Sequence, residues 1–169
     1  MTFLRTNGPT DETHLKPGVG GSLDSWLTWL ERSRADEIDL GLERCEQVAL
    51  NLNLTKLEPT VVTVAGTNGK GSSVSLLEAI LLEAGYRTGT YSSPHISCFN
   101  ERIQLSGMNI DDHLLCDAFL RVSLVEGAEQ LTYFEFITLA ALLIFTSVDI
   151  DFVILEVGLG GRLDAVNII

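Results

Sequence analysis

Hydrophobic positions recur along this chain at helical spacing in some segments and form short continuous runs in others, and this alternation predicts the order of its elements. Two amphipathic helices come first. Their apolar faces contain Trp26, Leu27, Trp29 and Leu30, and then Leu42, Cys45, Val48, Ala49 and Leu52. Ser22 or Asp24 is placed to cap the first helix, and Pro59 ends the second.

Short apolar runs rich in β-branched residues predict strands, and runs without polar alternation predict strands buried on both faces. The predicted strands lie at about 60–65, 87–91, 102–105 and 152–157, the third of them at an edge of the sheet. Further helices are predicted at about 70–83, 111–125 and 132–148. Three or four strands alternating with helices predict an α/β fold with a partial doubly wound, mostly parallel sheet.

The helix at 70–83 is predicted to bury one stripe of side chains against this sheet and to end at a glycine. The predicted stripe is Val74, Leu77, Ile80 and Leu81, and the terminating residue is Gly85.

A glycine-rich turn joins the strand at 60–65 to the helix at 70–83, with a lysine inside it. Such a turn lets backbone N–H groups converge on an anion at a helix N-terminus, and the lysine can reach the outer phosphates of a nucleotide. The predicted ATP-binding residues are Gly66, Thr67, Asn68, Gly69, Lys70, Gly71 and Ser72.

The turn departs from the common pattern G-x-x-x-x-G-K-[ST]. Val64 stands at the first glycine position, and Gly71 stands where a hydroxyl residue is usual. The alternative to a phosphate-binding loop is a turn that only links a strand to a helix.

Composition limits the classes of partner. The formal net charge is 11 − 23 = −12, which disfavours nucleic acid and anionic membrane surfaces. Cys45, Cys98 and Cys116 are widely spaced and predict free thiols, without a disulfide framework or a zinc site. The start of the chain lacks a signal-peptide pattern, and the apolar run 136–148 is too short to cross a bilayer. We therefore expect a cytoplasmic protein.

Two regions differ in their predicted organisation. Residues 1–21 are polar and rich in Gly, Pro and Thr, which predicts a mobile tail. Residues 22–169 contain all the predicted elements. The stretch 158–169 is followed by no closing helix and no second domain, so we expect the chain to be a truncated part of a larger domain.

Three candidate site features follow the carboxyl ends of predicted strands, where ligands bind in open α/β sheets. They are the glycine-rich turn, the pair Ser92 and Ser93, and Glu156. A hydroxyl and a carboxylate beside a triphosphate suit Mg²⁺, which prefers oxygen ligands. For Glu156 the alternative is a structural ion pair with an arginine such as Arg162. His95 can contact a phosphate or cap its loop, and the sequence leaves both open.

Two further segments allow a structural or a binding role. Thr132–Phe136 combines aromatic side chains with Glu135, which is typical of a helix N-terminus but also suits the wall of an aromatic substrate pocket. The glycine-rich segment 158–164 can bring its backbone, an arginine and an aspartate close to a ligand.

Six motifs in order resemble the folylpolyglutamate synthase and dihydrofolate synthase family, a branch of the Mur-ligase-like ATP-dependent amide ligases. The resemblance covers about residue 22 to the end and is closest to the bacterial bifunctional type. The matching segments are Asp39–Arg44, Val64–Ser72, Tyr91–His95, Asn100–Ile103, Leu131–Glu135 and Leu155–Ala165.

The resemblance implies a Mur-ligase-like central ATPase domain, of which residues 22–169 are the N-terminal part without the C-terminal domain. It implies a cytoplasmic, monomeric enzyme of folate biosynthesis that joins L-glutamate to dihydropteroate or folate through an acyl phosphate, with ATP and Mg²⁺. By position, Lys70 and Glu156 are catalytic, and Ser93 and Glu156 bind the metal. The segments matching the pterin site are Thr132, Tyr133, Phe134, Glu135, Leu163, Asp164 and Ala165.

Two other functions remain as alternatives. A cell-wall Mur-type ligase is expected to have Thr where Gly71 stands and to lack the Tyr133–Glu135 motif. A nucleotide-binding fragment without catalysis is the other, because the family's further metal and ATP ligands lie beyond Ile169.

Overall fold

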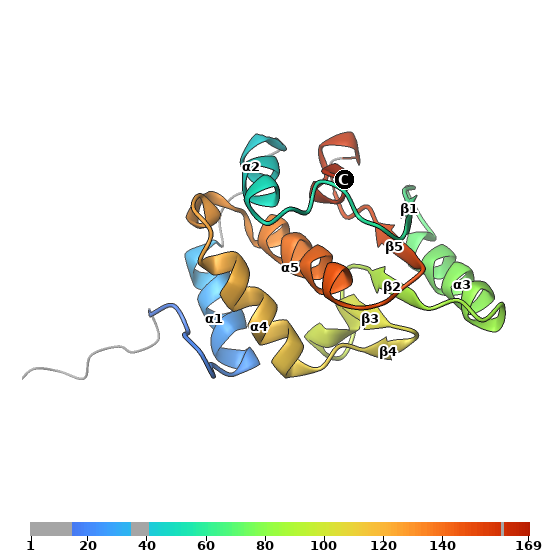
Figure 1. The fold of residues 1–169 in the computed structure, drawn as a ribbon, viewed down its shortest axis with the longest axis horizontal. Helices are drawn as coiled ribbons and strands as arrows, with labels where there is room; N and C mark the ends of the chain where they lie inside the picture. The colour runs from blue at the N-terminus through green and yellow to red at the C-terminus, as the bar shows by residue number, and fades with distance from the viewer. Residues whose placement is uncertain (1–14, 35–40, 160) are drawn as a thin grey trace, which may run out of the picture.

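A mixed five-stranded sheet separates two unequal helical layers in the computed structural model, which describes residues 15–34, 41–159 and 161–169 (Figure 1). The strand order is β1-β5-β2-β3-β4. Strands β1, β5 and β2 are parallel, and β3 and β4 continue the sheet antiparallel. The strands are β1 Thr60–Val64, β2 Thr88–Tyr91, β3 Ile103–Leu105, β4 Met108–Asn109 and β5 Phe152–Glu156.

The centre of the parallel part is β5, which explains its unbroken apolar sequence. Val153, Ile154 and Leu155 are fully buried because β5 has a parallel neighbour on each side and helices on both faces. The register pairs Val64 with Glu156 and Tyr91 with Leu155. The carboxyl ends of β1, β5 and β2 therefore meet at one edge of the sheet.

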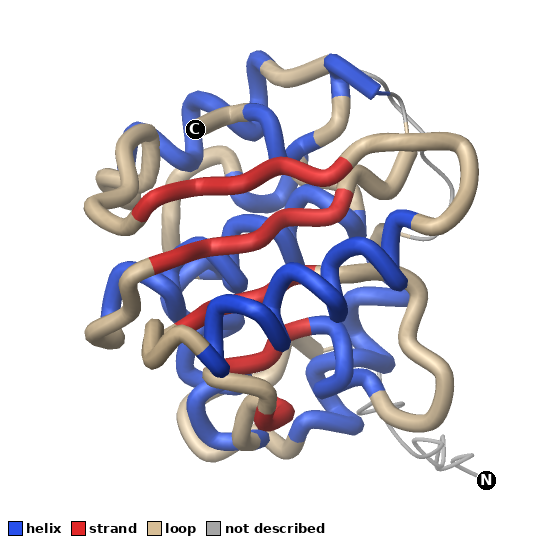
Figure 2. Tube along the Cα trace, turned by 90° about the vertical axis from the view of Figure 1, so that its right-hand side faces the viewer, coloured by secondary structure: helices blue, strands red, loops and turns tan. Residues whose placement is uncertain are grey.

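Helix α3 (Lys70–Glu83) covers one face of the sheet and lies in front of the strands in Figure 2. Its boundaries match the predicted helix, and Gly85 has the left-handed backbone (φ +86°) that ends it. The predicted buried stripe is wrong at Ile80, which is 58% exposed. Glu78 is buried instead, since it accepts hydrogen bonds from Thr88 Oγ1 (2.9 Å) and Gly107 N (3.1 Å).

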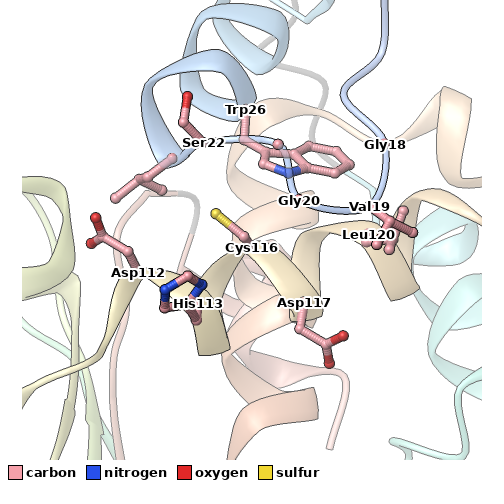
Figure 3. A pocket seen from close by; sticks show the side chains of 12 residues that line it. Gly18, Val19, Gly20, Ser22, Trp26, Asp112, His113, Cys116, Asp117 and Leu120 are labelled. Atoms are coloured by element: carbon pink, nitrogen blue, oxygen red, sulfur yellow. The ribbon is translucent and has the colours of Figure 1, made fainter.

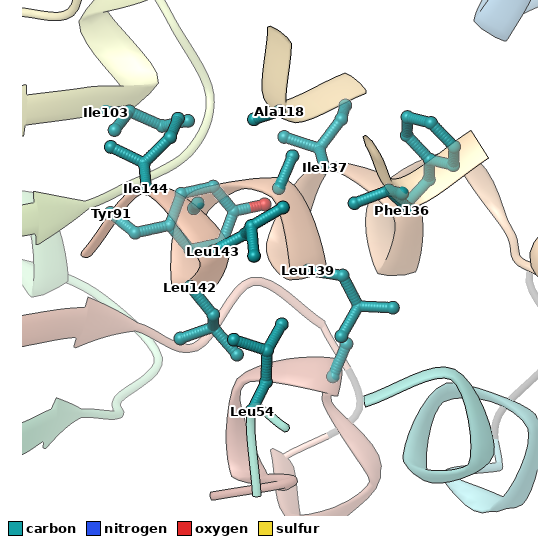
Figure 4. Packing of buried hydrophobic residues seen from close by; sticks show 14 of the residues in the cluster. Leu54, Tyr91, Ile103, Ala118, Phe136, Ile137, Leu139, Leu142, Leu143 and Ile144 are labelled. Atoms are coloured by element: carbon teal, nitrogen blue, oxygen red, sulfur yellow. The ribbon is translucent and has the colours of Figure 1, made fainter. Parts of the chain in front are cut away.

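Four helices form the layer on the other face: α1 Leu23–Ser33, α2 Glu43–Asn51, α4 Asp112–Ser123 and α5 Tyr133–Ser147. Helix α5 lies between the sheet and the other helices, so every residue from Glu135 to Phe145 is buried. Figure 4 shows side chains of α5 packed toward Tyr91 and Ile103 of the sheet and toward Leu54. Short 3₁₀ helices lie at Phe99–Arg102, Ala128–Gln130, Gly161–Leu163 and Ala165–Asn167.

The α/β class and the helices on both faces are confirmed, with two differences at the sheet edge. The strand predicted near 102–105 is not at an edge, because β4 pairs with its outer side and brings the number of strands to five. Only two residues form β4, too few for an apolar pattern to predict it. Of the two predicted caps for α1, the structure uses Ser22, whose Oγ accepts from Ser25 N (3.3 Å).

Parts of two predicted segments lie outside the described residues, namely 1–14 of the predicted tail and 35–40, which includes Asp39 and Leu40. Within 15–21, Lys16 Nζ donates to the carbonyl of Ser123 (3.1 Å) at the end of α4. Across the described part of the chain, no helix is both long and apolar enough to span a bilayer.

Candidate nucleotide and metal site

The glycine-rich turn has the geometry of a phosphate-binding loop. Gly69 adopts a left-handed backbone (φ +74°) immediately before α3 begins at Lys70. Residues Gly66 to Gly69 are exposed, and no side chain caps the N-terminus of α3. The first backbone N–H groups of a 14-residue helix are thus open toward an anion.

Lys70 folds back over its own loop. Its Nζ donates to the carbonyl of Gly66 (3.0 Å), and the salt bridges of the described residues do not include it. A single exposed hydrogen bond to a carbonyl is readily exchanged for bonds to phosphate oxygens. The lysine is therefore placed to neutralise an anion bound by the loop.

Glu156 and Ser93 lie together beside this loop. Glu156 ends β5 and is 5% exposed, and its Oε2 accepts from Ser93 N (3.1 Å). A methyl group at Gly71 would lie 3.9 Å from the same oxygen, which brings the start of α3 against the carboxylate. The alternative ion pair with Arg162 is absent from the described residues, where Ser93 N is the one hydrogen-bond partner of this carboxylate.

These groups fit a magnesium ion in part. A buried carboxylate with one hydrogen-bond donor keeps acceptor capacity, and burying such a group is unfavourable unless something compensates its charge. An adjacent serine hydroxyl adds the oxygen donor that Mg²⁺ takes together with waters and phosphates. Among the described residues no cluster of three or more His, Cys, Asp or Glu side chains can hold a metal, so protein ligands alone do not form a closed site.

In the structure His95 makes contacts within its own loop, which is one of the two roles left open by the sequence, and its contact with a phosphate stays a prediction. Arg102 Nε donates to His95 Nδ1 (3.0 Å), and the imidazole packs against the ring of Phe99 at 5.8 Å. The guanidinium of Arg102 in turn lies over the Phe99 ring. His95 thus holds its own loop to the 3₁₀ helix that follows.

Among the predicted pterin residues, Phe134 lies beside the metal candidates. A methyl group at Gly158 would lie 2.9 Å from Cζ of Phe134 and 3.3 Å from Oγ of Ser93. The Phe134 ring also packs on Tyr91 at 5.9 Å. Because residue 158 has no side chain, the aromatic ring and the metal-candidate serine lie side by side.

Glu135 and Thr132 build the start of α5. Thr132 Oγ1 accepts from Glu135 N (3.3 Å) and Glu135 Oε2 accepts from Thr132 N (2.7 Å), which is a reciprocal capping box. The same Glu135 oxygen accepts from Arg44 Nε (2.9 Å). The helix N-terminus foreseen from the sequence is present, and the Glu135 carboxylate points to Arg44. Tyr133 is half-buried at this corner, and burial raises the pKa of its hydroxyl.

The three predicted residues at 163–165 separate in the structure. Asp164 is 2% exposed, and its carboxylate accepts from Leu159 N (2.8 Å) and Val166 N (3.1 Å), so it closes its own loop. Burial raises the pKa of this carboxyl, although the backbone donors oppose the shift. Ala165 is buried next to α5, whereas Leu163 is 47% exposed.

Three residues of this region were given no role from the sequence: Arg34, Arg44 and Glu101. Arg34 donates to the carbonyl of Leu131 and lies over the rings of Trp29 and Phe136. Arg44 and Glu101 stand in two of the family motifs, which was the available signal. Their hydrogen bonds cross loops, so spacing in the sequence does not reveal them.

A cavity of about 490 Å³ lies elsewhere, between the glycine segment 18–21 and α4. Figure 3 shows Trp26, Cys116 and His113 on its walls. None of the predicted site residues lines it. Burial raises the pKa of Cys116, which disfavours a reactive thiolate there.

Fold and site together define an α/β protein in which a loop with phosphate-binding geometry follows the first strand of a sheet covered by helices on both faces. No protein-family model matches this chain. Over 153 residues it is 48% identical to the dihydrofolate synthase/folylpolyglutamate synthase of Escherichia coli (strain K12), covering 90% of this chain and 36% of that protein.

Two solved structures agree with this homology. A bifunctional folylpolyglutamate synthase/dihydrofolate synthase with Mn, AMPPNP and L-glutamate bound has a TM-score of 0.84 and 47% identity, over 92% of this chain and 37% of that one. E. coli FolC in complex with DHPP and ADP has a TM-score of 0.84 and 47% identity, over 90% of this chain and 37% of that one. The chain is thus homologous to these ligases and spans about a third of their length.

Proposed function

We propose that this chain binds Mg·ATP and supplies the phosphate loop and part of the metal site of an ATP-dependent ligase that joins L-glutamate to dihydropteroate and to folates. The observation that carries the proposal is the meeting of Gly71, Glu156 and Ser93 at the carboxyl ends of the parallel strands. Residues 22–169 are then the N-terminal part of the ATP-binding domain. The homologous structures with AMPPNP, Mn, L-glutamate and DHPP support these ligand classes.

The chemistry needs a phosphoryl group moved to a carboxylate. An oxygen of the substrate carboxylate attacks the γ-phosphorus and ADP leaves, which gives an acyl phosphate. The glutamate amine then attacks the acyl carbon, phosphate leaves, and the nitrogen loses a proton. In this proposal the loop amides and Lys70 bind the phosphates and offset their charge, and Glu156 and Ser93 hold Mg²⁺, which neutralises charge on the transferred group.

Phe134 supports a substrate site next to the phosphates. Its ring lies against Gly158 beside Ser93, so a flat ring system packed on it is close to the metal candidates. We assign Thr132–Glu135 and Leu163–Ala165 to the pterin side, with Phe134 and Tyr133 as contacts. Glu135, Asp164 and Ala165 are buried, so in this proposal they support the pterin site without forming its surface.

The test is to measure the affinity for Mg·ATP by isothermal titration calorimetry in the wild-type chain and in Lys70→Ala. Lys56→Ala is the matched control. Lys56 is an exposed lysine near the opposite edge of the sheet, beside Pro59 and Ile150. A hydrogen bond to a charged group contributes about 1.5–3 kcal/mol, so Lys70→Ala is expected to weaken binding by about 10- to 150-fold. Lys56→Ala should bind as the wild type does. Equal affinity in all three proteins would contradict the proposal.

ADP release then separates binding from turnover. The chain is incubated with Mg·ATP, dihydropteroate and L-glutamate, and again with each of the two substrates left out in turn. Release that needs both substrates and disappears in Lys70→Ala establishes the ligase reaction. Binding without release assigns this chain to nucleotide binding alone.

A further inference from the structure

The segment that carries Ser93 has little regular structure of its own. Residues 94–98 are all exposed and lie between β2 and the 3₁₀ helix Phe99–Arg102. At its start, Ser92 N donates to the carbonyl of Arg102 (2.9 Å) and Ser93 N donates to Glu156 (3.1 Å). Among the described residues these bonds hold the backbone of Ser92 and Ser93 but not the Ser93 hydroxyl, whose position therefore follows the backbone of its loop.

One side chain holds the far half of this loop. The carboxylate of Glu101 accepts three consecutive backbone N–H groups, from Ile96 (2.7 Å), Ser97 (3.1 Å) and Cys98 (3.1 Å). Both carboxylate oxygens take part. These bonds hold the pKa of Glu101 below its usual range. The carboxylate thus supplies acceptors that a strand or helix would otherwise provide.

The residues on either side of Glu101 tie it to the rest of the structure. Its neighbour Asn100 donates through Nδ2 to the carbonyl of Ile110 (2.8 Å) and to Asp112 Oδ1 (2.7 Å), at the start of α4. On the other side, Arg102 donates to His95 of the same loop. The three residues Asn100, Glu101 and Arg102 therefore connect the Ser93 loop to α4.

We infer that Glu101 is a positioning residue of the metal site, which acts through the backbone of residues 96–98 to keep Ser93 beside Glu156. The inference rests on the proposed function. Glu101 has no place in the apolar core and no strand pairing depends on it. Its removal is therefore expected to loosen the loop while the sheet and helices remain folded.

The test compares Glu101→Gln with Glu78→Gln, which makes the same chemical change at another carboxylate. Glu78 also accepts a backbone N–H, that of Gly107, but it belongs to the far half of α3 and touches no part of the Ser93 loop. Each protein is examined by hydrogen–deuterium exchange of peptides covering 92–98, by Mn²⁺ titration with AMPPNP followed by electron paramagnetic resonance, and by thermal unfolding.

Glu101→Gln is expected to speed exchange in 92–98 and to weaken Mn²⁺ binding roughly 10-fold, the scale of second-layer changes at metal sites, with little change in Tm. Glu101→Asp, which keeps both oxygens on a shorter stem, should show smaller losses in both measurements. Glu78→Gln should lower Tm and leave loop exchange and Mn²⁺ affinity as in the wild type.

Two results would overturn the inference. If Glu101→Gln binds Mn²⁺ with wild-type affinity, the residue does not position the site. If its Mn²⁺ affinity falls only in step with a Tm loss like that of Glu78→Gln, its role is general stability. A wild-type chain that binds neither Mn²⁺ nor AMPPNP overturns the proposed function itself, which distinguishes the two failures.

Discussion

The phosphate loop and the corner where α5 begins differ in how their side chains are used. In the loop, residues 66–69 are exposed, and within the described part of the chain Lys70 bonds to a carbonyl of the loop itself. At the corner, defined here as Thr132–Glu135 with Arg44, Glu135 is 5% exposed and takes part in a capping box and an ion pair. The polar groups of the loop are therefore free to bind a ligand, whereas Glu135 and Thr132 of the corner already bond to each other and Glu135 to Arg44.

This difference separates two kinds of motif residue. Groups whose hydrogen bonds are few and exposed can exchange them for bonds to a ligand at little cost. A buried carboxylate that already accepts two donors is costly to disturb, because its charge would lose its partners. Residues of the α5 corner should therefore affect folding when changed, and residues of the loop should affect binding.

The largest effect is expected for Glu135→Ala. The change removes the acceptor of Arg44 Nε and of Thr132 N together, in a place where the side chain of Glu135 is 6% exposed. Breaking a buried ion pair from one side typically costs 3–5 kcal/mol, and we expect about 3 kcal/mol here because Arg44 keeps some contact with water. Urea unfolding followed by circular dichroism measures the loss.

The matched control is Glu46→Ala, an exposed glutamate in the first turn of α2, which should change stability by less than about 0.5 kcal/mol. Mg·ATP affinity should stay at the wild-type value in folded Glu135→Ala. A stable Glu135→Ala protein with weakened nucleotide binding would break the distinction between the two regions.

Gly158→Ala tests the point where the two regions meet. The added methyl group would lie 2.9 Å from the Phe134 ring, closer than real Cβ atoms come to a neighbour, and 3.3 Å from Ser93 Oγ, which is a tight contact. Overpacking of this kind costs about 1–3 kcal/mol, and we expect about 2 kcal/mol together with weaker binding of Mn²⁺ and AMPPNP. Thermal unfolding and metal titration measure the two effects.

Two further variants sharpen this prediction. Gly18→Ala adds the same group where no atom lies within 4 Å, and it should be neutral. Combining Gly158→Ala with Phe134→Leu removes the ring that the new methyl group meets. The double variant should therefore lose less stability than the losses of the two single variants added together. If the double variant loses as much stability as the two single variants together, or more, the clash is not with Phe134.

The pattern of apolar residues predicted most of the fold because, in helices and in buried strands, it extends over several consecutive residues. The limits of α3 matched, and β5 was recognised as a buried strand from its unbroken apolar run. The two-residue β4 has no such repeat, and its pairing with β3 depends on the turn at Ser106 and Gly107. Glu78 was missed because its partners, Thr88 and Gly107, lie far along the chain.

The geometry of the candidate site was predictable where it is local in sequence or is set by the ends of the strands. The phosphate loop is one continuous segment, so its residue types and spacing revealed its geometry. The rule on strand ends pointed to Glu156 and to the pair Ser92 and Ser93, the resemblance selected Ser93, and Ser93 does lie beside Glu156. The partners of Glu135 and Glu101 could not follow, since Arg44 is 91 residues from Glu135 and an acid in a loop does not reveal which amides it accepts.

The smallest effect is expected for Asp151→Asn, at the amino-terminal ends of the parallel strands, where charged groups are paired but exposed. Arg87 Nη2 donates to Asp151 Oδ1 (2.9 Å), Arg87 N donates to Oδ2 (2.8 Å), and the pKa of Asp151 is lowered to about 2 mainly by these bonds. A carboxyl whose pKa is lowered by folding stabilises the protein above its unfolded pKa, near 3.8, and loses that contribution as pH falls toward 2. Asp151→Asn should therefore have a slightly lower Tm than the wild type at pH 5, and the difference should shrink at pH 3. Mg·ATP affinity at pH 7 should be the same in both proteins, because Asp151 lies at the amino-terminal ends of the parallel strands and the candidate site lies at their carboxyl ends.

A difference in Tm that grows on acidification would show that another carboxylate controls the stability of this end of the sheet.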